Sequence, residues 1–236
     1  MKYLIITLTF LCFSQNNATA QGVRLQSGFH ISTGISGIKK VPGYEYSNGS
    51  IQDPTKMNNR FSNFVEAGID TKLSWNKFNI EFGLALKQAT FDIENLYYTL
   101  DGYAGPIYLD ETYRINYLEV PISFGYQLPL NTNQTVFCNL SAGTSVGGSL
   151  IFWEEISFST AGYAVEKYYE KTFRFSSFSF GKIQFVIDES AFKKFRGSIF
   201  MGPKFEFSNS IFPYTYLNDL GYKHPWNLNF QIGLLL

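Results

Sequence analysis

The chain has 236 residues, enough for one domain or at most two, and its 19 Lys and Arg balance its 19 Asp and Glu. A neutral chain lacks the basic face that a nucleic-acid binder needs, so nucleic acid is excluded as a partner. Aromatic residues make up 18% of the chain, which excludes disorder. The mean hydropathy is nevertheless only −0.08, so the aromatics either fill a soluble core or form a regularly spaced apolar face.

The first twenty residues have the three parts of a secretory signal peptide. Lys2 precedes an apolar run over 3–13, and Ala18-Thr19-Ala20 provides a cleavage site. We therefore expect residues 1–20 to be a cleaved signal peptide and 21–236 to form one exported domain. Cys138 is then the single cysteine of the mature chain, and no intramolecular disulfide can hold the domain together.

Apolar residues recur at every second position in several segments, which is the pattern of β-strands with two different faces. Thirteen residues from Val23 to Ile35 alternate in this way, and three segments at 112–127, 173–187 and 195–207 have a blurred phase. In the first of these, Tyr113, Ile115 and Tyr117 give way to Leu118 and Val120, a change of phase that predicts a β-bulge. Together with further alternating segments, the pattern predicts eight strands, at 23–35, 65–74, 78–87, 112–127, 136–145, 173–187, 195–207 and 226–236.

The predicted connections alternate between short and long. Short turns are expected near 75–77, 128–134 and 188–194, and long loops at 36–61, 88–111, 148–172 and 208–225. This alternation is typical of an outer-membrane barrel, with turns on the periplasmic side and loops outside the cell. Eleven residues at about 3.3 Å each, tilted by about 45°, cover about 26 Å, enough for the apolar band. The sequence therefore predicts an all-β, eight-stranded antiparallel up-and-down transmembrane barrel in the outer membrane.

In such a barrel the charged set of each strand faces the interior. Eight strands leave room for side chains only, so we expect a plugged lumen held by ion pairs and no open pore. A soluble ligand-binding barrel would have the opposite arrangement, with apolar residues around a cavity, and remains the structural alternative. The residues expected in the polar lumen network are Arg24, Glu66, Asp70, Lys72, Glu81, Lys87 and Arg114.

One segment carries a resemblance to a known family. Residues 115–122 read Ile-Asn-Tyr-Leu-Glu-Val-Pro-Ile and resemble the signature of the PorT-like outer-membrane β-barrels of Gram-negative bacteria. The small-residue run over 140–148 looks like the following strand of that family. The resemblance implies an integral outer-membrane barrel, and some relatives serve a machine that secretes proteins. The chain departs from many such barrels because it ends in Leu236 rather than an aromatic residue. The motif residues are Tyr117, Leu118, Glu119, Val120 and Pro121.

Catalytic and metal-binding signals are weak. Gly143-Thr144-Ser145-Val146-Gly147 matches G-x-S-x-G, but a nucleophile elbow needs a strand–turn–helix context, and this motif is expected to end a strand. His30 and His224 are the two histidines, and neither lies in a cluster of metal-ligand residues. The sequence predicts no catalytic residues, no metal and no cofactor.

The expected long loops are the part of the chain most suited to binding other molecules. They hold twelve of the 16 tyrosines, and tyrosine suits recognition surfaces because it buries a large area at low entropy cost. We therefore expect a non-enzymatic barrel with outer-membrane lipid around it and extracellular protein contacts at its loops. A subunit of a secretion complex is the alternative that the resemblance implies. The loop tyrosines are Tyr44, Tyr46, Tyr97, Tyr98, Tyr103, Tyr108, Tyr163, Tyr168, Tyr169, Tyr214, Tyr216 and Tyr222.

Overall fold

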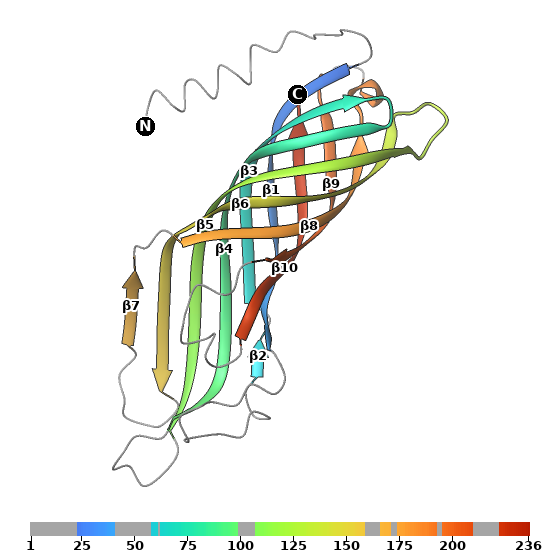
Figure 1. The fold of residues 1–236 in the computed structure, drawn as a ribbon. Helices are drawn as coiled ribbons and strands as arrows, with labels where there is room; N and C mark the ends of the chain where they lie inside the picture. Colours follow the sequence, from blue (N-terminus) through green and yellow to red (C-terminus); the bar gives the residue numbers. More distant parts are fainter. Residues whose placement is uncertain are drawn as a thin grey trace.

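The computed structural model shows a closed barrel of antiparallel strands (Figure 1). It describes residues 23–40, 58–60, 62–98, 107–158, 166–170, 174–192, 195–209 and 222–236. The expected signal peptide lies outside these residues. The strands are β1 (Val23–Lys40), β2 (Asn58–Arg60), β3 (Ser62–Trp75), β4 (Phe78–Tyr98), β5 (Ile107–Pro129), β6 (Val136–Phe158), β7 (Glu166–Glu170), β8 (Arg174–Ile187), β9 (Ser198–Ser208) and β10 (Tyr222–Leu235).

Eight long strands form the wall of the barrel, as predicted. Each pairs with its neighbour in chain order, and β1 pairs with β10 to close the ring, for example at Ile31↔Ile232. The short strands β2 and β7 add to β4 and β6 outside the ring. Closure leaves the wall without a free edge, so its backbone groups are satisfied within the ring.

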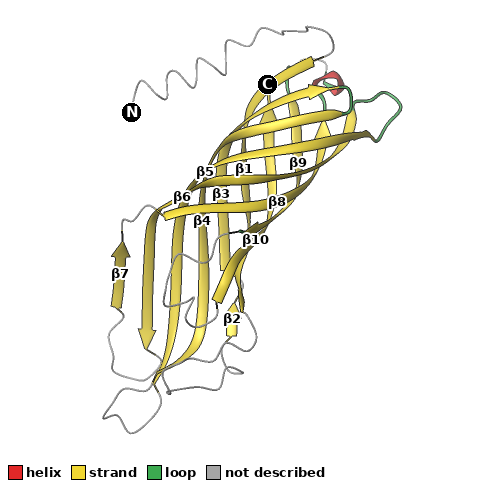
Figure 2. Ribbon diagram, viewed as in Figure 1, coloured by secondary structure: helices red, strands yellow, loops and turns green. Residues whose placement is uncertain are grey.

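The two ends of the barrel differ in their connections, and we call them the turn end and the loop end. At the turn end, β3 and β4 are joined by Asn76 and Lys77 alone, and Asn76 takes a left-handed φ of 53° that asparagine tolerates in such hairpins. The connection from β5 to β6 and the 3-10 helix η1 (Glu189–Ala191) lie at the same end (Figure 2). These positions agree with the three predicted short turns.

The strands β4, β5 and β6 are much longer than predicted. They have 21, 23 and 23 residues, whereas a strand needs about 9–11 to cross a membrane. Beyond the ring they continue at the loop end as a sheet that also carries β7 (Figure 1). The expected loops 88–111 and 148–172 are therefore largely strands, because lipid-facing alternation stops where a strand leaves the apolar band.

Several of the tyrosines expected in loops lie on strands instead. Half of the twelve lie on strands, and the other half lie outside the described residues. The expectation that all twelve belong to loops was therefore wrong for the first group. The tyrosines on strands are Tyr97, Tyr98, Tyr108, Tyr168, Tyr169 and Tyr222.

The predicted β-bulge in β5 was wrong. Tyr113, Ile115, Tyr117 and Glu119 are all buried on the same inward face, so the strand keeps one phase throughout. What changes along β5 is the surroundings, since apolar residues fill the lumen at the loop end while polar residues face outward there. The irregularity lies in the partner strand, where the β5–β6 register skips Leu150.

The barrel is polar inside and apolar outside. Gln, Asn, Ser, Lys and Glu side chains dominate the buried polar set, and large hydrophobic side chains are exposed around the outer wall. A soluble carrier barrel has the reverse arrangement, so this burial pattern overturns that alternative.

Candidate functional site: the charged lumen

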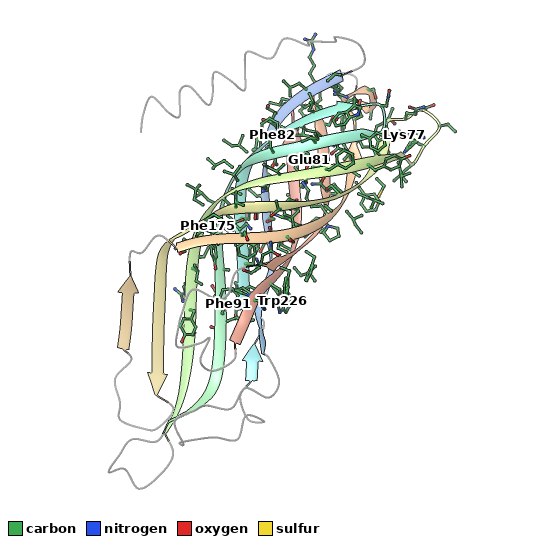
Figure 3. The ribbon with its side chains drawn as sticks, viewed as in Figure 1. Lys77, Glu81, Phe82, Phe91, Phe175 and Trp226 are labelled. Atoms are coloured by element: carbon green, nitrogen blue, oxygen red, sulfur yellow. The ribbon has the colours of Figure 1, made fainter. Side chains whose placement is uncertain are left out.

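The strands bring charged side chains from far apart in the sequence into one lumen. Period-two alternation places every second residue of each strand on the inward face, where Glu81 is visible in Figure 3. Ten side chains belong to this lumen network by their ion pairs: His30, Glu66, Asp70, Lys72, Glu81, Lys87, Glu119, Lys182, Lys204 and Glu206.

The part of the network nearer the loop end consists of two lysines and three glutamates. Lys87 Nζ lies 2.6 Å from Glu119 Oε2 and 3.0 Å from Glu206 Oε1. Lys204 Nζ lies 2.6 Å from Glu206 Oε1 and 3.0 Å from Glu66 Oε1. All five side chains are almost completely buried. Such charges are tolerated in a protein interior only when they are paired, and here each one is.

His30 joins the lysine–glutamate cluster to Asp70. Its Nδ1 lies 2.5 Å from Asp70 Oδ2 and its Nε2 lies 2.9 Å from Glu66 Oε1. Only the imidazolium form donates from both ring nitrogens, so the geometry assigns a positive charge to His30. The network then contains five cations, four lysines and one histidine, against five carboxylates.

The part of the network nearer the turn end is centred on Glu81. This carboxylate contacts Lys182 directly, and Lys72 Nζ lies 3.5 Å from its Oε1. Asn139 donates to Glu81 Oε1 at 3.2 Å and accepts from Asn79 at 2.7 Å. One carboxylate therefore serves two lysines, with neutral amides completing its hydrogen bonds.

Apolar side chains lie at both ends of the charged network. At the loop end, Tyr117 packs edge-on against Phe178 at 5.6 Å between ring centroids, and Lys87 Nζ lies 4.5 Å from the Phe178 ring. Phe64, Phe91 and Tyr113 are also completely buried on inward-facing positions near this end. A smaller cluster near the turn end contains Val186, Phe200, Leu235 and Phe137.

The residues predicted for the polar lumen divide into three groups. Glu66, Lys72, Glu81 and Lys87 are buried in the lumen, and Asp70 is partly buried beside His30. Arg24 lies at the mouth of the turn end. Arg114 is the exception, because its side chain is exposed on the outer wall of β5. The assumed bulge placed Arg114 inward, and the continuous phase of β5 places it outward.

Arg24 pairs with the connection between β8 and β9. Its guanidinium lies 2.5 Å from Asp188 Oδ2 and 3.0 Å from Glu189 Oε1. Burial would raise the pKa of the Asp188 carboxyl, but hydrogen bonds from Ser190 and Arg24 and the charge of Arg24 hold that pKa below its usual range. The ion pair ties β1 to the neighbouring turn.

The motif that carries the family resemblance is divided between the two faces of β5. Tyr117 and Glu119 point into the lumen, where Glu119 accepts from Lys87 and from Ser145 Oγ. Leu118 lies on the outward face with the exposed Val120. Pro121 pairs in register with Ser145 of β6. The glutamate of the motif is thus a member of the charged lumen.

Five members of the network were not named from the sequence. The alternation of apolar residues in β1 and β5 does indicate that His30 and Glu119 face inward. The need to balance the charges of the other inward residues was the signal that could have identified these two as members of the network. Lys182, Lys204 and Glu206 lie in β8 and β9, whose phase is blurred because Phe178, Phe180 and Phe200 also point inward.

The G-x-S-x-G match has a structural role. Residues 143–147 lie wholly inside β6, so the strand–turn–helix geometry of a nucleophile elbow is not formed. Ser145 Oγ donates to Glu119 Oε2 at 2.5 Å within the lumen. His224 stacks on Phe207 at 5.4 Å, and its Nδ1 lies 3.2 Å from the carbonyl oxygen of Ser208. Neither residue contacts the other in the described hydrogen bonds.

The described part of the chain contains neither a metal-binding cluster nor a helix that could span a membrane. No group of three or more His, Cys, Asp and Glu side chains is arranged there to hold a metal ion. No helix there is long and apolar enough to cross a membrane. The chemistry that the lumen itself supports is charge pairing in a confined interior.

Comparison with solved structures finds similarity to Ail and to the outer membrane protein OprG. Ail, the attachment invasion locus protein of Yersinia pestis, in complex with the heparin analogue sucrose octasulfate, is 13% identical with a TM-score of 0.35, covering 89% of this chain and 98% of its own. OprG from Pseudomonas aeruginosa is 11% identical with a TM-score of 0.35, covering 90% and 93%. No family model and no curated protein matches the sequence.

Proposed function

We propose that the protein is a non-enzymatic integral outer-membrane barrel with a closed, ion-paired lumen, and that its loop end makes contacts outside the cell. The observation that carries this proposal is the exposed apolar wall around a charged interior. Phe29, Ile31, Leu86, Ile122 and Phe230 are each at least half exposed, and they lie on four strands of the wall. In water such a surface would aggregate, whereas in lipid it is the stable arrangement.

The height of the apolar wall suits a bilayer. From Trp226 to Leu236, at the end of β10 and just past it, every second residue is apolar and faces outward. Ten steps at about 3.3 Å, tilted by about 40°, cover about 25 Å, close to the apolar band of outer-membrane barrels. Outward polar residues begin beyond Leu86, where Gln88 and Asn116 hydrogen-bond to each other.

Aromatic residues lie near both borders of this wall. At the turn end, Trp75, Phe78 and Phe124 have ring centroids within 6.5 Å of one another, and Tyr126 lies 5.3 Å from Phe78. Towards the loop end, Trp226 lies 6.5 Å from Phe205 (Figure 3). Aromatic girdles of this kind mark the two membrane interfaces of transmembrane barrels.

The membrane location is tested by fractionation and by gel mobility. The proposal expects recovery with outer membranes and a folded band that shifts on boiling. Recovery of the native protein in the soluble periplasm contradicts it.

The closed lumen is tested separately in planar bilayers. The paired network and the aromatic side chains at the loop end support a barrel without a large steady conductance. A large, stable single-channel current from the purified protein contradicts the closed lumen but leaves the membrane location standing.

A second candidate function is a subunit of a protein-secretion complex. It rests on the resemblance of 115–122 to PorT-like barrels and on the long β4–β6 extension, which offers a large surface beyond the membrane. Affinity purification from detergent extracts separates the two candidates. Stable co-purification with large membrane proteins favours the subunit, and a barrel purified alone favours the first candidate.

A further inference from the structure

A polar pocket opens at the turn end of the barrel, on the opposite side from the long extension. Its volume is about 210 Å³, enough for several water molecules or one small solute. Its lining comes from β1, β3, β5, β6, β8, β9 and the turns, so it is built by most of the barrel rather than by one loop. Arg24, Gln26, Lys72, Gln127 and Gln134 contribute side chains with hydrogen-bond donors.

Backbone hydrogen bonds tie the rim of this pocket together. The Gln127 amide donates to the Lys77 carbonyl at 2.7 Å, which connects β5 to the β3–β4 turn. The Asp188 amide donates to the Thr135 carbonyl at 2.9 Å, which connects the next two turns. Arg24 completes this side of the rim through its ion pair with Asp188. A rim fixed before a ligand arrives loses little conformational entropy on binding.

Two rim residues hold uncommon backbone conformations beside the pocket. Asn76 has a φ of 53° and Gln134 a φ of 51°, and both line the pocket. Left-handed φ is unusual for glutamine, and such positions persist where the surrounding structure fixes them. Asn131 does so here, because its Oδ1 accepts from the Thr135 and Val136 amides. These hydrogen bonds fix the backbone of the turn from which the Gln134 side chain extends.

At the base of the pocket, the cation Lys72 shares its carboxylate partner with another lysine. The Lys72 side chain is only 2% exposed, and its partner Glu81 lies 3.5 Å away while contacting Lys182 more closely. Lys72 also lines a second, water-sized void of about 10 Å³ together with Asp70 and Glu81. The one carboxylate on the rim, Asp188, is already engaged by Arg24 and by the Ser190 amide.

We propose that this pocket binds a small polar solute that places a carboxylate against Lys72 and hydroxyl or amide groups against the rim. The buried lysine selects negative charge at the base. The side-chain amides of Asn76, Gln127 and Gln134 both donate and accept, which suits a solute rich in hydroxyl or amide groups. A carboxylate-bearing monosaccharide has this chemistry. The site depends on the turn end alone and not on any partner at the loop end.

Titration of the refolded, ¹⁵N-labelled barrel in detergent micelles with glucuronate tests the proposal. Saturable shifts of the Asn76, Gln127 and Gln134 side-chain amide resonances are expected. Glucose has the same ring without the carboxylate, and we expect it to bind at least about tenfold more weakly, because it lacks the charge-assisted contact with Lys72. Absence of saturable glucuronate shifts, or equal affinity for glucose, overturns the proposal.

Two variants and one matched control locate the site. Lys72→Met should weaken glucuronate binding at least about tenfold and leave glucose binding unchanged. Gln134→Gly keeps the left-handed backbone and removes the amide, so it tests the rim even if Lys72→Met fails to fold. Gln88→Ala, on the outer wall, is the control and should bind as the parent does. Parent-like glucuronate affinity in folded Lys72→Met or in Gln134→Gly overturns the assignment.

Discussion

Lys87 of β4 and Glu119 of β5 form a buried ion pair in the lumen, with Nζ 2.6 Å from Oε2. The same lysine lies 3.0 Å from Glu206, so its removal would leave two carboxylates without their shared cation. We expect Lys87→Met to lower the free energy of unfolding by about 3–5 kcal/mol. Urea unfolding in lipid vesicles measures this loss.

The control for this variant is Lys77→Met, which removes an exposed lysine of the β3–β4 turn and should change stability by no more than about 0.5 kcal/mol. Combining Lys87→Met with Glu119→Gln should recover part of the loss, because Glu206 still pairs with Lys204 and the charge of Glu119, which loses its partner, is then removed. Parent-like stability of Lys87→Met would contradict the pairing described for the lumen.

Gly68 of β3 leaves room for the His30 ring. A Cβ at this position would lie 2.5 Å from His30 Cε1 and 2.9 Å from the Leu84 carbonyl oxygen. His30 is held between Asp70 and Glu66 and cannot easily move aside. We expect Gly68→Ala to lower the free energy of unfolding by about 1–3 kcal/mol through overpacking.

Gly181 of β8 is the matched control, since a Cβ there meets nothing closer than 4.0 Å. Gly181→Ala should therefore be neutral or slightly stabilising. Thermal or urea unfolding of both variants in the same detergent provides the comparison. Equal stability of the two variants would show that His30 is not fixed in place.

The number of strands and the direction of most faces could be predicted from period two alone. In lipid each strand must show one apolar face, and the alternation of Val23–Ile35 follows directly from that requirement. The alternation no longer indicates the inward face where a strand leaves the lipid, because lipid no longer requires an apolar outer surface there. Beyond the lipid, β5 turns Tyr113 and Ile115 inward and Arg114 outward, so the same strand seemed to change phase.

The partners within the lumen could not be predicted, because ion pairs depend on the register between strands far apart in sequence. Lys204 meets Glu66 across 138 residues, and Lys182 meets Glu81 across 101. Balanced charge on inward faces indicates that pairs will form without saying which. The turn-end pocket could not be predicted for the same reason, since six strands and three turns contribute to its lining.

The ion pair between Arg24 and Asp188 should make stability at the turn end depend on pH. The pKa of Asp188 is lower in the folded protein than the ordinary aspartate value of about 3.9. Its contribution is therefore fully present above about pH 4 and is lost as the pH falls through the lowered folded pKa. Because Arg24 is partly exposed, we expect less than about 1 kcal/mol.

Asp188→Asn tests this dependence. The difference in unfolding free energy between the parent and the variant should be present at neutral pH and should shrink progressively as the pH falls below about 4. Glu189→Gln, at the more exposed partner of Arg24, should show a smaller difference at neutral pH. A difference that stays constant down to strongly acidic pH would contradict the role of the Asp188 carboxylate.

Ile31 tests whether the apolar wall faces lipid. It lies near the middle of β1, is 59% exposed, and pairs in register with Ile232 and Ala67 on its two sides. An arginine at the bilayer midplane of a barrel costs about 2–4 kcal/mol and near the interface only about 0–1. We therefore expect Ile31→Arg to lower the free energy of unfolding in vesicles by about 2–4 kcal/mol.

Gln88→Arg supplies the matched comparison, because Gln88 is exposed on the outer wall just beyond the apolar band. Its effect should be no more than about 1 kcal/mol in the same vesicles. The expected difference between the two variants arises from their depths in the bilayer. If the wall faced water, both arginines would be solvated and the two substitutions would have similar effects. Equal effects of the two substitutions, with a native barrel that stays soluble without detergent, would therefore refute the membrane location.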